Sequence, residues 1–75
     1  MKIEVGKTYI NKNKHAGRDI KRHNRKIHIP LEITVLKNNG TLVGIPNIHS
    51  YEVIDELGNK STIDDEDADN LIEKI

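Results

Sequence analysis

The sequence contains no cysteine, no tryptophan and no phenylalanine, and it has only two tyrosines and two prolines. Without cysteine the chain has neither disulfide cross-links nor a thiolate nucleophile, so packing alone must hold the fold, as is usual in cytosolic proteins. Tyr9 and Tyr51 provide too few aromatic rings for the stacking platform of single-strand nucleic-acid binders. These absences argue against a disulfide-rich secreted protein and against a stacking-based nucleic-acid binder.

Long apolar runs are missing as well. No apolar run approaches the roughly 20 residues that a membrane-spanning helix needs, and residues 1–5 lack the apolar stretch of a signal peptide. We therefore expect a soluble, cytoplasmic protein with no membrane partner. A chain of 75 residues forms a single domain, 1–75, and a domain of this size buries only about 60% of the surface that its unfolded chain exposes. Because so thin a core leaves no enclosed site, we expect no catalytic residues and no enzyme activity.

Charge is distributed unevenly along the chain although the formal net charge is zero. Residues 1–40 contain ten Lys or Arg and three acidic residues, whereas residues 41–75 contain two Lys and nine acidic residues. Such asymmetry indicates a charged partner, which can be a nucleic acid, a membrane surface or an oppositely charged protein. The alternative interpretation is that the two sets of charges lie side by side in the fold and compensate each other through weak surface pairs.

Alternating apolar residues predict strands in the first half of the chain. Residues 3–10 form one predicted strand, in which Gly6 marks a bend or bulge. Residues 26–35 form a second, longer one, because every odd position from 27 to 35 is apolar. Pro30 cannot donate a hydrogen bond to a neighbouring strand, so we expect an edge or a bulge at that position.

A hairpin and two further strands are predicted in the second half. Asn38-Asn39-Gly40 contains the residues that tolerate positive φ, so it predicts a hairpin turn before a strand over residues 41–45. Pro46-Asn47 interrupts the pattern, residues 51–55 read as the next strand, and a turn at 57–60 leads to a short strand that ends near Ile63.

The C-terminal segment changes period and predicts a helix over about residues 64–75. Asp64 is a suitable N-cap, and the acidic residues after it favour the positive end of the helix dipole. The apolar positions have the spacing i, i+3, i+4, i+7 of one helix face: Ala68, Leu71, Ile72 and Ile75. We therefore expect Leu71 and Ile72 to be core residues.

The predicted fold class is mainly β (α+β), a small five-stranded, strongly bent antiparallel sheet or an SH3-like barrel with a C-terminal helix. The opening segment, residues 5–10, followed by a loop and a strand-hairpin-strand unit, resembles small SH3-like β-barrel proteins of low-GC bacteria and their phages. The chain departs from that pattern by its long basic first loop and its appended helix. The resemblance implies a binding module that presents loops to a partner, and it implies no particular site residue.

Residues 11–25 read as a long polar loop, and loops of this length in compact domains are usually functional or disordered. Together with Lys26 the loop contains seven cations, which are our candidate partner-binding or phosphate-binding residues: Lys12, Lys14, Arg18, Lys21, Arg22, Arg25 and Lys26. Seven cations could neutralise several phosphates. The sequence pI of about 6.9, however, lies well below the value expected of a dedicated nucleic-acid binder.

The four histidines do not have the spacing of a metal site. His15, His23, His28 and His49 include no i, i+3 or i, i+4 pair, and the chain has no cysteine to assist them. We expect them to face solvent or a partner, with no metal and no cofactor bound.

These observations favour a non-enzymatic binding module, a small adaptor or inhibitor of the phage type, whose partner is a protein with an acidic surface. The alternative is a nucleic-acid-binding accessory protein that contacts phosphates through the basic loop, residues 12–26. Self-association of the basic segment of one copy with the acidic segment of another is a third hypothesis, and such a head-to-tail contact must close into a ring or propagate.

Overall fold

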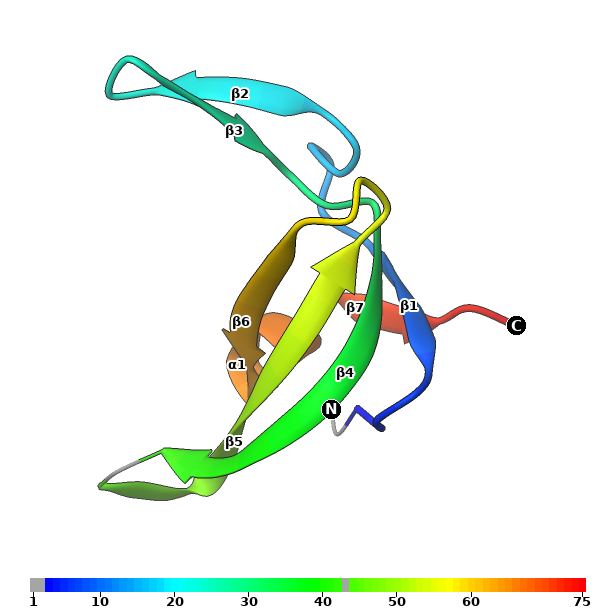
Figure 1. Cartoon of the computed structure of the whole chain (residues 1–75), viewed down its shortest axis with the longest axis vertical. Helices are drawn as coiled ribbons and strands as arrows, with labels where there is room; N and C mark the ends of the chain where they lie inside the picture. The colour runs from blue at the N-terminus through cyan, green and yellow to red at the C-terminus, as the bar shows by residue number, and fades with distance from the viewer. Residues whose placement is uncertain (1–2, 43) are drawn as a thin grey trace.

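The computed structural model of the chain describes residues 3–42 and 44–75, and it consists mainly of β-strands, as the sequence predicts (Figure 1). The elements in chain order are β1 (Thr8–Asn11), β2 (Asp19–Arg22), β3 (Arg25–His28), β4 (Glu32–Leu42), β5 (Ile45–Asp55), β6 (Lys60–Asp64), α1 (Asp65–Ala68) and β7 (Leu71–Glu73). Five strands form one sheet in the order β6-β5-β4-β1-β7, and β2 and β3 form a separate two-stranded sheet. All strand pairs of the larger sheet are antiparallel.

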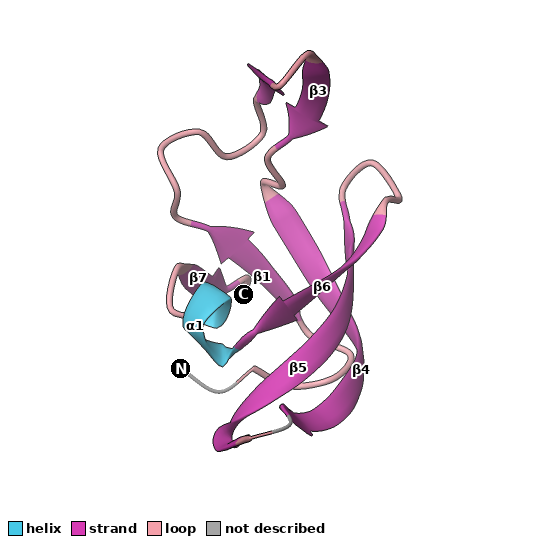
Figure 2. Ribbon diagram, turned by 90° about the vertical axis from the view of Figure 1, so that its left-hand side faces the viewer, coloured by secondary structure: helices cyan, strands magenta, loops and turns pink. Residues whose placement is uncertain are grey.

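The five-stranded sheet is strongly bent. β4 and β5 contain 11 residues each and curve over most of the length of the molecule (Figures 1 and 2). β6 and β7 are the two edges, and α1 connects them (Figure 2). Because these edges are not paired with each other in the described part of the chain, the structure is an open bent sheet and not a closed barrel.

The inner face of this sheet carries the core. Side chains alternate between the faces of a strand, so the antiparallel partners Val35 and Val53 place their side chains on the same face, as do Tyr9 and Ile33. The buried core residues are Ile3, Tyr9, Ile33, Val35, Tyr51, Val53, Ala68 and Leu71, and Ile63 packs against them. Burial of these side chains is the main favourable contribution to folding in a chain without disulfides.

The first predicted strand is shorter than expected. β1 begins at Thr8, and the segment before it turns at Gly6, whose φ of +88° is readily adopted only by glycine. Gly6 N donates to Val35 O at 2.8 Å, and Val35 N donates to Lys7 O at 3.0 Å, so the turn stays bonded to β4. Ile3 is buried as the pattern predicts, but Val5 is 55% exposed because the turn removes it from the sheet.

The long strand predicted over residues 26–35 is two strands in two sheets. β3 ends at His28 and β4 begins at Glu32, and Pro30 lies in the break. In place of the predicted bulge or edge, the chain leaves one sheet and enters the other at Pro30. Before Pro30, the N–H group of Ile29 donates to Arg18 O beside the smaller sheet, and after it β4 pairs with β1 and β5. Ile33 is buried in the core, but Ile27 is 39% exposed.

The predicted hairpin is confirmed, but its turn is displaced. β4 and β5 pair along their lengths, and β4 continues through Asn38-Asn39-Gly40 to Leu42. The positive φ of Gly40 occurs where the register shifts between Asn38 and Gly40, so this glycine accommodates a bulge in place of the turn. The connection of the hairpin includes residue 43, which lies outside the described residues, and Pro46 and Asn47 belong to β5.

The predicted C-terminal helix is mostly wrong. Asp64 is the N-cap as expected, and it forms a capping box with Asp67, but α1 ends at Ala68. The chain then forms β7, which pairs with the free edge of β1 and places Leu71 in the core at 4% exposed. Ile72 points to the other face and is 48% exposed, so the expectation that it is a core residue is wrong. Within the residues that the structure describes, no helix has the length and apolar character needed to cross a membrane.

Candidate functional site

The second half of the segment predicted to be a basic loop at residues 11–25 belongs to a β-hairpin, so the loop prediction is wrong from residue 19 onward. β2 and β3 pair antiparallel from Asp19 opposite His28 to Arg22 opposite Arg25. The two turn residues, His23 and Asn24, have φ of 50° and 63°, which is typical of a two-residue type I′ turn. Asparagine tolerates this conformation, but the His-Asn pair lacks the glycine that signals such turns in a sequence. Only residues 12–18 form a connecting loop.

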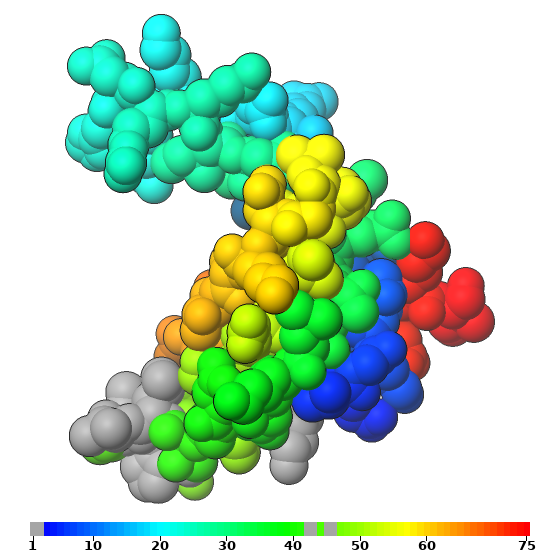
Figure 3. Space-filling model, viewed as in Figure 1, coloured from blue at the N-terminus to red at the C-terminus, as the bar shows by residue number. Residues whose placement is uncertain are grey.

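We call residues 18–29 the basic ribbon. It projects from one end of the five-stranded sheet and stands apart from it (Figures 1 and 3). None of the core residues in the described part of the chain belongs to the ribbon. Its pairing extends one residue beyond β2 and β3, because Ile29 N donates to Arg18 O and Gly17 N donates to Ile29 O. The ribbon is therefore a hydrogen-bonded arm without a core of its own.

Alternation along the two strands divides the ribbon side chains between two faces. The Arg-Ile face carries Arg18, Ile20, Arg22, Arg25, Ile27 and Ile29, and the Lys face carries Asp19, Lys21, Lys26 and His28. On the Arg-Ile face the three arginines are exposed, Ile27 is 39% exposed and Ile20 is half-buried. This face thus combines accessible apolar surface with three guanidinium groups.

Like charges lie opposite each other at the tip of the ribbon. Lys21 pairs with Lys26 and Arg22 pairs with Arg25 in the antiparallel register. Directly opposite residues have Cβ atoms about 5 Å apart, and like charges at that separation are destabilising. The Lys26 ammonium lies 3.4 Å from the Asp19 carboxylate, which relieves part of the repulsion on the Lys face. On the Arg-Ile face, no ion pair of Arg22 or Arg25 relieves the repulsion among the residues that the structure describes.

The seven predicted cations do not form one cluster. All of them are exposed, and five belong to the ribbon. Lys12 and Lys14 lie in the connection that precedes it, where Lys12 N donates to Asn70 O and so stays close to the five-stranded sheet. The structure therefore brings five of the seven cations together on the ribbon: Arg18, Lys21, Arg22, Arg25 and Lys26. Lys12 and Lys14 lie outside the ribbon, in the connection between β1 and β2.

His28 bonds the ribbon to the larger sheet. Its Nδ1 lies 2.8 Å from Asp19 Oδ1 within the ribbon, and its Nε2 lies 3.1 Å from Glu56 Oε2 in the turn between β5 and β6. Hydrogen bonds with Asp19 and Glu56 raise the pKa of His28, and the bonds of Asp19 with His28 and Lys26 lower the pKa of Asp19. Burial acts to raise the pKa of Glu56, but hydrogen bonds from backbone N–H groups, that of Leu31 first, hold it below its ordinary value.

The acidic C-terminal segment has structural roles. Asp65 Oδ1 accepts a hydrogen bond from the hydroxyl of Tyr51 at 2.8 Å, and Asp65 Oδ2 accepts one from His49 N at 2.8 Å. Asp64 and Asp67 form the capping box. Burial acts to raise the pKa of Asp65, but the bonds from His49 and Tyr51 outweigh it and lower that pKa. Burial raises the pKa of Tyr51 to about 12, so its hydroxyl stays protonated and donates to Asp65.

Among the described residues, Lys side chains of the larger sheet pair with acidic residues from the other part of the chain. Lys7 pairs with Glu73 at 2.8 Å, and Lys74 pairs with Glu32 at 2.6 Å. In the described part of the chain no such pair between the halves involves a Lys or Arg of the basic ribbon. The side-by-side interpretation of the charges therefore applies to the sheet and not to the ribbon.

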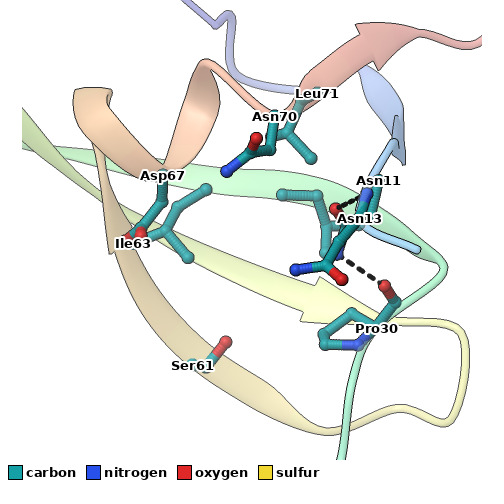
Figure 4. Close-up of a pocket in the computed structure, with 9 residues that line it drawn as sticks. Asn11, Asn13, Pro30, Ser61, Ile63, Asp67, Asn70 and Leu71 are labelled. Atoms are coloured by element: carbon teal, nitrogen blue, oxygen red, sulfur yellow. Dashed lines mark hydrogen bonds between the residues drawn. The ribbon is translucent and has the colours of Figure 1, made fainter. Parts of the chain in front are cut away.

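A pocket of about 290 Å³ opens between β6 and the start of the connection after β1 (Figure 4). Asn11 Nδ2 donates to Pro30 O at 2.9 Å, and Asn13 N donates to Asn11 Oδ1 at 3.0 Å, so these polar groups hold the pocket wall together. Its volume is at the lower end of the range for small-molecule sites, which typically occupy about 300 to 1,000 Å³. We assign no ligand to it.

Comparison with protein-family models, curated proteins and solved structures finds no match for this chain. Within the described residues, the basic ribbon contributes none of the core residues and pairs like charges at its tip.

Proposed function

We propose that this protein is a non-enzymatic binding module, a small adaptor or inhibitor, that binds an acidic protein surface through the Arg-Ile face of the basic ribbon. The observation that carries the proposal is the arrangement of Arg18, Arg22 and Arg25 around exposed Ile27 on one face of a projecting arm. Interfaces between proteins are enriched in arginine and have an apolar centre, and this face has both properties.

Charge complementarity supports an acidic partner. Residues 12–28 contain seven Lys or Arg and one acidic residue, while the rest of the chain contains five and eleven. An anionic partner would relieve the repulsion between Arg22 and Arg25, which face each other across the ribbon. A partner carboxylate can accept two hydrogen bonds from one guanidinium group, which makes arginine well suited to such a contact.

Binding to nucleic acid is the second candidate function, and the like-charged tip favours it. A two-stranded ribbon fits the major groove of duplex DNA, where Lys21, Arg22, Arg25 and Lys26 would neutralise phosphates. Two observations favour a protein partner over it. Tyr9 and Tyr51 are 3% and 0% exposed, so neither ring can stack on a base, and the rest of the chain carries an excess of acidic residues that repels a polyanion.

The two faces of the ribbon provide a matched pair of variants. Arg22→Glu with Arg25→Glu reverses two charges on the Arg-Ile face, and Lys21→Glu with Lys26→Glu reverses two on the Lys face of the same strands. Each protein is used as bait in a pull-down from bacterial lysate, with and without nuclease and at low and moderate salt. Circular dichroism of each variant verifies that the fold is retained.

We expect a discrete protein band that survives nuclease with the wild-type bait and with the Lys-face variant, and that is lost with the Arg-face variant. The affinity for the identified partner should fall roughly tenfold or more in the Arg-face variant, because arginine anchors at interface centres often contribute more than about 1 kcal/mol each. Recovery of nuclease-sensitive material alone, reduced equally by both variants and by salt, would reject the protein partner and establish the nucleic-acid candidate.

A further inference from the structure

Three potential metal ligands from two separate parts of the chain meet at the base of the basic ribbon. One ligand atom each of His28, Asp55 and Glu56 lies within 4.8 Å of the others. His28 ends β3, Asp55 ends β5, and Glu56 begins the turn that follows β5. The side chains of His28 and Glu56 are 15% and 23% exposed, although Glu56 as a whole residue lies at the surface, so the group is open to an ion from solvent.

Backbone hydrogen bonds hold both carboxylates in place. The carboxylate of Glu56 accepts a hydrogen bond from Leu31 N at 3.0 Å. Asp55 Oδ1 accepts hydrogen bonds from Leu57 N and Asn59 N, both at 2.9 Å. A carboxylate oxygen has two acceptor positions, so each group keeps lone pairs free for a cation. The protein therefore orients these two carboxylates whether or not a ligand is bound.

The histidine has the second partner that metal-binding histidines need. A histidine ligand usually donates its remaining ring N–H group to a carboxylate, which fixes the tautomer and the ring orientation. His28 Nδ1 lies 2.8 Å from Asp19 Oδ1, which leaves Nε2 directed toward Glu56. Asp19 is thus an orienting residue and not a ligand in this arrangement.

The charge of the group suits a divalent ion, and its ligand atoms lie near one another without yet having coordination spacing. Ligand atoms about 2.0 Å from a tetrahedral zinc ion lie about 3.3 Å from one another. His28 Nε2 is 3.1 Å from Glu56 Oε2, and the ligand atoms of all three residues lie within 4.8 Å, so at least one side chain must move closer to bind the ion. With His28 neutral, the three carboxylates of Asp19, Asp55 and Glu56 and the nearby ammonium of Lys26 sum to two negative charges, which a dication neutralises. A nitrogen ligand beside two carboxylates favours a transition ion such as zinc over calcium, which takes oxygen ligands.

We propose that His28, Asp55 and Glu56 bind one divalent transition-metal ion of the zinc class, with Asp19 orienting His28 and water completing the coordination. The ion would take the position of the proton between His28 and Glu56 and would join the basic ribbon to the five-stranded sheet. The spacing of the histidines in the sequence indicated no metal site, since the three ligands come from positions 28, 55 and 56 and only the fold brings them together. This inference does not rest on the proposed binding function.

The test uses the full chain without a histidine tag. Zinc chloride is titrated into the wild-type protein by isothermal calorimetry, and cobalt chloride is titrated with detection of the visible absorption that reports coordination geometry. Near-isosteric variants remove one ligand at a time while keeping a hydrogen-bond acceptor at the same place: His28→Gln, Asp55→Asn and Glu56→Gln. His15→Gln is the matched control, because His15 is exposed and lies in the connection before the ribbon.

We expect one saturable zinc site per chain, weakened roughly 10- to 100-fold by Asp19→Asn and more strongly by each of the three ligand variants, with His15→Gln unchanged. In the wild-type protein, which needs no variant to fold, zinc should shift the amide resonances of residues 28, 55 and 56 and of the turn at Leu57 to Asn59. Absence of saturable binding at millimolar zinc would overturn the proposal. Loss of binding in His15→Gln equal to that in His28→Gln would also overturn it.

Discussion

The core of the five-stranded sheet and the tip of the basic ribbon consist of the same secondary structure but pair different kinds of residue. In the sheet, Val35 lies opposite Val53 and both side chains are 1% exposed. In the ribbon, Lys21 lies opposite Lys26 at the exposed tip. The first pairing removes apolar surface from water and stabilises the fold, whereas the second brings like charges together. The buried core of the described residues therefore lies outside the ribbon, and the tip of the ribbon adds repulsion and no core residue.

The largest expected change in stability lies within the sheet, where the adjacent β7 residues Leu71 and Ile72 differ in burial. Leu71→Asp should unfold the protein, because a buried unpaired charge costs several kcal/mol and small domains have little stability to lose. Ile72→Asp should change the free energy of unfolding by less than about 1 kcal/mol, because Ile72 is 48% exposed. Urea denaturation measures both. A folded Leu71→Asp protein would show that β7 does not contribute to the core.

A smaller effect is expected at the bond between the sheet and α1. Tyr51→Phe removes the hydroxyl that donates to Asp65, and we expect a loss of about 1 kcal/mol in the free energy of unfolding. Such a loss lowers the melting temperature of a domain of this size by about 4 to 8 °C. Tyr9→Phe is the matched control. Its hydroxyl accepts a bond from the backbone of Glu4, an exposed residue, so the decrease in melting temperature should be smaller.

The same bond predicts a dependence on pH. Because the pKa of Asp65 is lowered in the folded state, its contribution to stability is present above the ordinary aspartate pKa of about 4 and is lost as pH falls through the folded-state pKa. The stability difference between the wild-type protein and Asp65→Asn should therefore be largest near neutral pH and shrink on acidification. Melting temperatures measured from pH 7 down to about pH 3 test this. A difference that stays constant would show that the charge of Asp65 is not what matters.

The smallest expected change in stability comes from reversing one charge of a surface pair. The same reversal in the ribbon and in the sheet compares the two regions directly. Lys21→Glu places opposite charges across the ribbon and should stabilise the protein by about 0.2 to 1 kcal/mol. In the sheet Lys37 already lies opposite Glu52, so Lys37→Glu should destabilise it by a similar amount. Melting temperatures at low and high salt measure both changes, which salt should reduce. Destabilisation by Lys21→Glu would mean that repulsion at the tip is already relieved within the chain.

Local signals in the sequence predicted several features correctly. Asp64 is the N-cap, Gly6 marks a turn, the hairpin of β4 and β5 forms, and the strand after the turn at 57–60 is β6. Each of these depends on neighbouring residues, such as a side chain that caps the next turn or a glycine at positive φ. The resemblance to SH3-like barrel proteins stays a prediction, and the cytoplasmic location does too.

Errors arose wherever a remote partner decides the structure. The spacing of Leu71 and Ile72 fits a helix face, but β1 offers an unpaired edge that accepts β7, and Lys74 N donates to Thr8 O. In the same way the isoleucines before and after Pro30 form one alternating pattern although they belong to two sheets. Periodicity reports which residues can share a face and not which strand lies beside them.

Alternation, composition and charge are local properties, so the amino-acid sequence is enough to predict that this chain forms mainly strands, that its cations concentrate in the first half and that the candidate site is basic. That the basic segment is a paired ribbon with an arginine face and a lysine face emerges from the fold. The fold alone places His28 beside Asp55 and Glu56. The physical reason is that strand register and contacts between distant residues depend on the free energy of the whole sheet, which no window of neighbouring residues contains.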